Sequence, residues 1–149
     1  MTKLLAGLAG LGAALAIGFL TTATARAEMT IVVVERATTD AVTDLGAKGD
    51  SAGDLLTFAN DIYDEQNGKK IGTDNGWCIR TVAGKAWECF WTISLPKGQI
   101  TVQGPFYDAG DSVLAVTGGT GSYTLVRGQM GLHARDDKGS EYDFKYSLR

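Results

Sequence analysis

The fold is decided by the stretch 71–107, which reads IGTDNGWCIRTV (71–82), AG (83–84), KAWECFWTISL (85–95), PKG (96–98) and QITVQGPFY (99–107). The three longer runs are rich in β-branched and aromatic residues, which favour strands. The short segments between them carry glycine or proline, which are typical of turns. The stretch therefore predicts three antiparallel strands in succession.

The same alternation of runs and turns continues on both sides of this stretch. Asn67-Gly68, the strongest short hairpin signal, precedes it, and no helical period is sustained anywhere. Eight short strands with glycine-rich turns predict an all-β sandwich or barrel, and periodicity alone does not choose between them. One long connection, 40–53, is expected to be either functional or mobile. The other expected strands are 31–34, 54–64, one between the glycines at 110 and 118, 122–134 and 140–148.

The N-terminal segment resembles a secretory signal peptide. Lys3 is followed by an apolar or small run over 4–20 and by Ala25-Arg26-Ala27, an A-x-A cleavage signal. The alternative, a membrane anchor, is disfavoured because the run is short and a processing site follows it. We expect cleavage after Ala27, a single domain over 28–149, no membrane span after cleavage, and a secreted or periplasmic location.

Charge and histidine content exclude several functions. Without Lys3 and Arg26, 12 basic residues remain against 17 acidic ones, a net charge of about −5. No Lys/Arg run is present, so nucleic acid is not an expected partner. His133 is the only histidine, and two isolated cysteines do not make a zinc signature. We therefore expect no metal and no cofactor, and a structural or exposed role for His133.

The spacing of the two cysteines fits a β-hairpin. A two-residue turn at 83–84 would pair Val82 with Lys85, Arg80 with Trp87 and Cys78 with Cys89. Directly opposed cysteines can form a disulfide, and export would permit one. The alternative is a pair of buried free thiols.

Several blocks of the sequence resemble the allene oxide cyclase and dirigent proteins, in the same order and with nearly the same spacing. The resemblance implies an eight-stranded antiparallel β-barrel holding one small ligand, commonly in a trimer. It therefore implies a hydrophobic small molecule and a homo-oligomer as partners. The blocks are GDLLTFANDIY (53–63), GWC (76–78), TVQGPF (101–106) and LAVTGGTG (114–121), with Gly128 beyond.

The resemblance, combined with strand alternation, also implies which side chains face the barrel interior. They form a mostly apolar cavity suited to a hydrophobic or aromatic ligand. The alternative is that they fill a closed core. The implied ligand-binding residues are Leu56, Phe58, Asn60, Cys78, Arg80, Trp91 and Phe106.

The family's catalytic residues are a glutamate and an asparagine just ahead of a Glu-Arg pair. Matching that pair to Glu35-Arg36 puts Val32 and Val34 at the catalytic positions, so plant-type cyclisation is expected to be absent. Another alignment gives Glu35 itself the acid's role. Asn60 replaces an aspartate of the dirigent proteins and can hydrogen-bond a phenol or carbonyl but cannot act as a base. Glu35 and Asn60 are thus the only catalytic candidates, and both are weak.

Three functions remain open at this point. The first is a secreted barrel that binds a hydrophobic or aromatic small molecule. The second is an isomerase or cyclase that folds a hydrophobic substrate for ring closure. The third is a structural, oligomeric secreted protein with a filled barrel.

Overall fold

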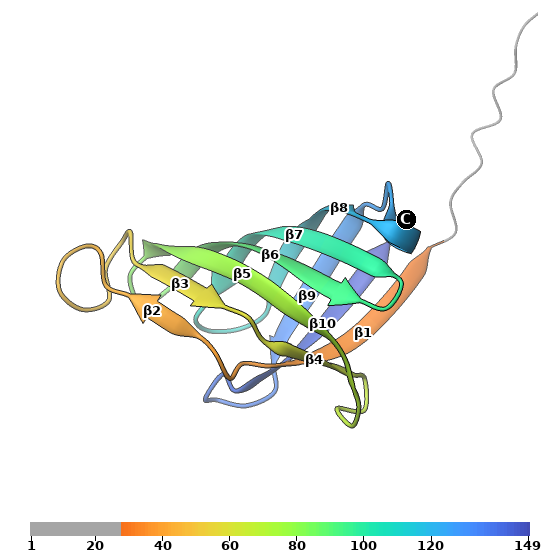
Figure 1. The fold of residues 1–149 in the computed structure, drawn as a ribbon. Coiled ribbons are helices and arrows are strands. Elements are labelled where there is room, and N and C mark those ends of the chain that lie inside the picture. The colour runs from red at the N-terminus through yellow and green to blue at the C-terminus, as the bar shows by residue number, and fades with distance from the viewer. Residues whose placement is uncertain (1–27) are drawn as a thin grey trace, which may run out of the picture.

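The computed structural model describes residues 28–149 and forms a closed barrel of antiparallel strands (Figure 1). The expected signal peptide, residues 1–27, lies outside the described residues. The strands are β1 Met29–Arg36, β2 Ala41–Thr43, β3 Leu55–Phe58, β4 Asp61–Asp64, β5 Lys70–Val82, β6 Ala86–Leu95, β7 Gly98–Tyr107, β8 Ser112–Gly119, β9 Gly128–Ala134 and β10 Glu141–Leu148.

These ten segments make up the eight strands of one barrel. β3 and β4 both pair with β5 and are two parts of one interrupted strand, while β1 pairs with β4 and β2 with β3. Each barrel strand pairs with the next one along the chain, and β10 pairs with β1 to close the sheet. The predicted eight-stranded antiparallel β-barrel is confirmed, and the sandwich is excluded because the sheet closes.

Strand alternation separates the barrel interior from its outer face. Along β6, Trp87, Cys89, Trp91 and Ile93 are buried, and the residues between them are partly exposed. This is the pattern expected of a sheet with one face in a core. No helix in the described part of the chain is long and apolar enough to cross a membrane.

The expected strand 122–134 is wrong in its first half. Gly121–Tyr123 forms a 3-10 turn (η1), Leu125 has a φ of 62°, and β9 begins only at Gly128. The Ser122 N–H donates to the Lys97 carbonyl at 2.8 Å, and the Tyr123 ring joins the core. The segment closes one end of the barrel instead of extending a strand.

The two-residue turn at 83–84 is also wrong, although the register beyond it is right. The turn has three residues, with Gly84 at a φ of 64°, and Val82 pairs with Ala86 across a bulge. The Lys85 N–H donates to the Val82 carbonyl at 3.0 Å and closes a β-turn in which Gly84 is the left-handed residue. Cys78 still opposes Cys89, and the two form a disulfide.

The long connection 40–53 is ordered by one carboxylate. It contains β2, and the buried Asp54 accepts hydrogen bonds from the backbone N–H groups of Leu45, Gly46 and Ser51. These bonds hold the pKa of Asp54 below its usual value. The connection extends from the barrel beside β2 and β3 (Figure 1).

Candidate functional site

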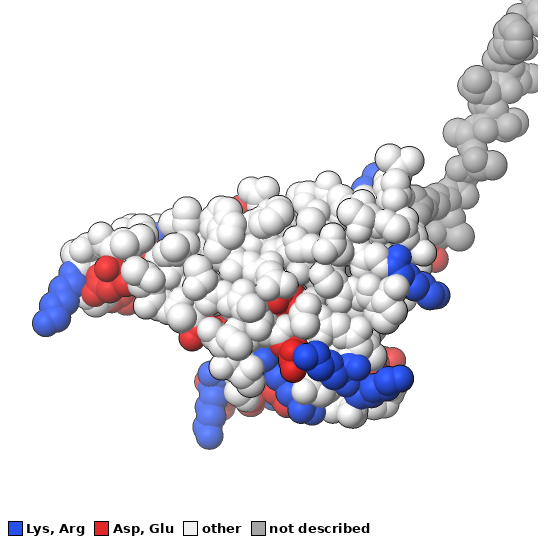
Figure 2. Space-filling view, in the orientation of Figure 1, with Lys and Arg blue, Asp and Glu red and all other residues white. Residues whose placement is uncertain are grey.

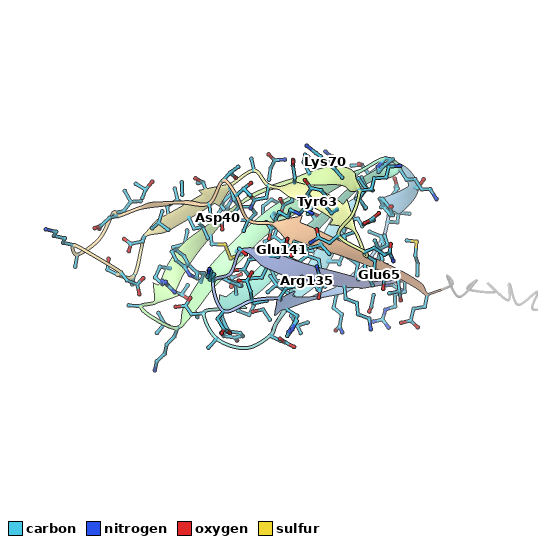
Figure 3. All side chains as sticks on the ribbon, turned by 90° about the horizontal axis from the view of Figure 1, so that it is seen from below. Asp40, Tyr63, Glu65, Lys70, Arg135 and Glu141 are labelled. Carbon is cyan, nitrogen blue, oxygen red and sulfur yellow. A yellow bond between two sulfur atoms is a disulfide. The ribbon has the colours of Figure 1, made fainter. Side chains whose placement is uncertain are left out.

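A cavity of about 40 Å³ lies inside the barrel, toward the end where β1 stops and β10 starts. Five of the seven implied ligand-binding residues line it, and the disulfide forms part of the wall. Figure 3 looks from below and shows Asp40, from the segment between β1 and β2, beside the disulfide. The lining is Glu35, Asp40, Leu56, Phe58, Cys78, Cys89, Trp91, Phe106, Leu132, Tyr142 and Phe144.

Five aromatic rings line the wall, three of them in contact through Trp91 and the other two as a pair. Trp91 lies 6.0 Å from Phe58 and 5.6 Å from Phe144, between ring centroids. Phe106 and Tyr142 meet edge to face at 5.9 Å. Gly76 makes room for them, since a Cβ atom there would lie 2.4 Å from the Trp91 Cβ and 2.6 Å from Phe58.

One buried carboxyl group projects into this apolar wall. Glu35, near the end of β1, is only 5% exposed. Its Oε1 accepts a hydrogen bond from Asn60 Nδ2 at 2.8 Å. Burial, followed by the charge of the neighbouring Asp74, raises the pKa of Glu35 well above its usual value. The carboxyl is therefore neutral over a pH range in which an exposed glutamate is ionised.

Asn60 lies behind the cavity lining and sets the positions of two carboxyl groups. Its Nδ2 donates to Asp40 Oδ1 at 2.7 Å as well as to Glu35. Its Oδ1 accepts from the N–H groups of Thr38 and Thr39 and from the Thr39 hydroxyl, at 2.9–3.0 Å. These bonds fix which end of the amide faces Glu35. Asn60, which is not among the residues that line the cavity, thus orients the acid.

A second buried carboxyl, Asp74 on β5, lies next to Glu35. It is fully buried, and its Oδ1 accepts from the Asn60 N–H at 3.2 Å. Burial raises the pKa of Asp74 from 3.8 to about 7. Two carboxyl groups this close in an apolar interior cannot both ionise readily, so the pair retains a proton near neutral pH.

Two further polar groups are buried near this pair, the Tyr146 hydroxyl and Trp91 Nε1, and they interact with each other. Burial, with the charge of Asp74, raises the pKa of Tyr146, and burial raises the pKa of Tyr142 to about 12. Both phenols are therefore neutral proton donors. Between residues 28 and 149 no group of three or more His, Cys, Asp or Glu side chains is arranged to hold a metal ion.

Arg80 is the implied site residue that lies away from the cavity. It points into the barrel on the same side of β5 as Cys78, but its guanidinium stacks 3.9 Å over Trp87. It also forms ion pairs with Asp50 and Asp108, each at 2.7 Å. The guanidinium thus connects the loop before β3, which carries Asp50, with the loop after β7, which carries Asp108.

The positions that the first alignment gives to the catalytic pair, Val32 and Val34, lie on the face of β1 opposite to the cavity. Val33 packs in the core and Glu35 lines the cavity, so strand alternation puts Val32 and Val34 on the outer face. Val34 lies there between its strand partners Tyr63 and Asp143. The other alignment gives the acid's role to Glu35, which lies in the cavity wall.

A larger hollow lies outside the cavity, at the rim of the barrel. Its volume is about 420 Å³, and it shares Phe106, Leu132 and Tyr142 with the inner cavity. Phe106 and Tyr142, both half-buried, thus form the partition between the two spaces. His133 lines this hollow, where its exposed ring meets Asp111 at 2.7 Å.

Sequence reasoning missed several residues of the site. Asp74 belongs to none of the quoted blocks and stands in a polar run of β5, so nothing in the sequence distinguishes it from an exposed aspartate. Tyr142 and Phe144 carry an available signal, because alternate positions of the last strand are aromatic. Asp40 reaches the site through the bend after β1, which periodicity does not reveal.

Comparisons with known proteins agree with this architecture. A family model described as allene oxide cyclase matches residues 28–136. The structure is similar to that of a pyocyanin demethylase, with a TM-score of 0.71 and 25% identity over 81% of this chain and 100% of that one. A pterocarpan synthase dirigent protein gives 0.61 and 13%, over 82% and 92% of the two chains. The Diels-Alderase AbmU from Streptomyces koyangensis gives 0.66 and 16%, over 85% and 70%.

The last two likenesses, at such low identity, show only the shared barrel. The family match covers most of the described residues and includes Glu35, Asn60 and Asp74. The chain belongs to the allene oxide cyclase family.

Proposed function

We propose that the protein takes a hydrophobic or aromatic small molecule into the barrel, against Glu35. One observation carries this proposal: an aromatic-walled cavity has a buried, hydrogen-bonded carboxyl at its edge. A ligand site of this kind is mostly apolar with a few fixed polar groups. A barrel serving only as structure gains nothing from a buried carboxyl pair, which costs folding free energy.

Ligand entry requires the partition to move. The inner cavity of about 40 Å³ is far below the roughly 300 Å³ that a small-molecule site needs. Rotation of Phe106 and Tyr142 would join it to the outer hollow of about 420 Å³. Both rings are half-buried and meet only edge to face, so this motion leaves the rest of the core in place.

Binding can be tested with 2-naphthol, a neutral aromatic probe, by fluorescence titration. We expect saturable binding that is lost when Leu56→Trp fills the cavity. Val113→Trp is the matched control, because Val113 lies on the outer face of β8 and is 55% exposed. Denaturant unfolding of both variants verifies that they fold. Equal binding by the two variants would refute the site.

Isomerisation or cyclisation is a second candidate function, favoured by the state of Glu35. A carboxyl with a raised pKa, oriented by an amide, can donate a proton and then stabilise the positive charge that results. Chiral analysis of the ring-closed product from the allene oxide of a fatty-acid methyl ester tests it. An enantiomeric excess that disappears in Glu35→Gln supports catalysis, and a racemic product at the background rate excludes it for this substrate.

We also propose export and self-association. The disulfide is compatible with an oxidising compartment, and N-terminal sequencing of exported protein should begin at Glu28.

The outer face of β5 and β6 carries exposed Trp77 and Ile79 beside Phe90. The corresponding face in Figure 2 shows few charged side chains. Such a face fits the homo-oligomer, commonly a trimer, that the family resemblance implies.

A further inference from the structure

We propose that the ligand of the cavity is an organic cation, with its positive charge on or beside an aromatic ring system. The proposal rests on the proposed binding function and names the chemical class of the ligand. It follows from the charges that line the cavity, from the basic groups that do not, and from the aromatic rings around them.

Every charged group that lines the cavity is acidic. Glu35 and Asp40 lie in the wall, and Asp74 lies directly behind Glu35. Neither Lys, Arg nor His contributes to the lining among the described residues. The three carboxyl groups are held together by a neutral amide, Asn60, which supplies hydrogen bonds and no charge.

The nearest basic side chains are paired with other groups. Arg36, next to Glu35 in the chain, lies 3.7 Å over the Tyr63 ring on the outer face and donates to Asn67. Arg80 is paired with Asp50 and Asp108 at the rim. Among the described residues, the carboxyl groups at the cavity thus have no basic partner, and Glu35 and Asp74 hold a proton instead. Asp74 is fully buried and interacts with Glu35.

The rest of the wall suits an organic cation and not a hydrated metal ion. Faces of Trp, Tyr and Phe attract a cation within about 6 Å, and more strongly when water is excluded. Trp91, Tyr142 and three phenylalanines supply such rings around Glu35. An aromatic cation can stack on these rings while its charge meets the carboxylates. A neutral aromatic molecule uses only the first of these interactions.

The entrance has the same sign as the interior. The outer hollow is lined by Asp108, Asp111, Asp136 and Asp137, and the basic side chains there are Arg135 and His133. Arg135 is paired with Asp143 at 3.0 Å, His133 with Asp111, and Asp108 with Arg80, so the acidic excess at the hollow comes from Asp136 and Asp137. A cleft lined mainly by one sign of charge raises the local concentration of the opposite charge. Cations are therefore concentrated at the partition.

Cation binding must be coupled to proton release. In the free protein the groups facing Glu35 are Asp74, Asp40, Tyr142 and Tyr146, and none is positive. A bound cation favours ionised Glu35 and Asp74 and lowers their pKa values, so protons leave. Affinity for the cation should rise as the pH rises toward and through about 7, the value to which burial raises the pKa of Asp74.

Calorimetry with two probes of the same shape tests the inference on the full mature chain. The probes are 1-methylquinolinium and its neutral isostere 1-methylnaphthalene, titrated in two buffers of different ionisation enthalpy. We expect the cation to bind at least about tenfold more tightly, because each unit by which it lowers a carboxyl pKa adds about tenfold to its affinity. The apparent enthalpy should depend on the buffer for the cation only.

Matched variants locate the charge. Glu35→Gln should remove most of the preference for the cation and leave the affinity for 1-methylnaphthalene within about twofold. Asp61→Asn, which removes an exposed outer carboxylate paired with Lys70, should change neither. Equal or tighter binding of 1-methylnaphthalene overturns the cation proposal and leaves the binding function intact. Failure of both probes to bind overturns both.

Discussion

Replacing Asp74 with asparagine should stabilise the protein at alkaline pH, against the usual effect of changing a buried residue. Asp74 is fully buried, and its pKa is raised from 3.8 to about 7. Asparagine keeps an oxygen that can accept from the Asn60 N–H and has no charge to bury. The variant therefore avoids the free-energy cost of burying an ionised carboxylate and keeps the hydrogen bond.

The magnitude follows from the difference between the folded and unfolded pKa values. Between 3.8 and about 7 the folded protein holds a proton that the unfolded chain releases, so wild-type stability falls as the pH rises through this window. At about 1.4 kcal/mol per unit, ionised Asp74 costs about 4 kcal/mol above pH 7. Roughly 2–3 kcal/mol of this develops between about pH 5 and pH 8.

Urea unfolding of wild type and Asp74→Asn at these two pH values measures the effect. The stability of the variant relative to wild type should increase by about 2–3 kcal/mol from the lower to the higher pH. Asp61→Asn, at an exposed site, should show no comparable change. A stability difference that is independent of pH, or that moves in the opposite direction, would refute the assignment of Asp74 as a buried, protonated carboxyl.

Three further predictions concern the barrel itself. Gly76→Ala should destabilise the protein by about 2 kcal/mol in thermal unfolding, because its Cβ would overlap Trp91 and Phe58; Gly131→Ala, whose Cβ meets nothing closer than 4.0 Å, should be nearly neutral. Replacing both disulfide cysteines with alanine should cost about 3 kcal/mol in urea unfolding for a link between residues 11 apart, and a loss below about 1 kcal/mol would show that the hairpin does not need it. Trp77→Lys should shift sedimentation toward the monomer, and an unchanged assembly would place the interface elsewhere.

The strands were predictable because their signals are local and repeated, whereas the choice of a barrel over a sandwich came from the family resemblance. The predicted Cys78–Cys89 pairing is present because a bulge between Arg80 and Val82 offsets the extra residue of the turn. The error at 122–127 arose because this segment has strand-like composition but is held by contacts with the 96–98 turn, which lies far from it in sequence. Local propensity cannot report such tertiary contacts.

The family resemblance and strand alternation together identify Leu56, Phe58 and Trp91 as interior, because every second residue of a half-buried strand faces the core. The resemblance also named Glu35 and Asn60 as candidates, but not their contact with Asp74. That contact depends on three segments meeting in space: β1 with Glu35, the β3–β4 bend with Asn60, and β5 with Asp74. Asp74 alone has the appearance of an ordinary surface aspartate.

The most direct test of the central claim is to locate a bound ligand by NMR. Protein with isotope-labelled leucine methyl groups is mixed with 2-naphthol, and nuclear Overhauser contacts between ligand and methyls are recorded. Binding in the barrel predicts contacts to Leu56 and Leu132, which line the cavity, and none to Leu45 and Leu125, which are exposed outside it. Contacts confined to Leu45 or Leu125 would contradict the account.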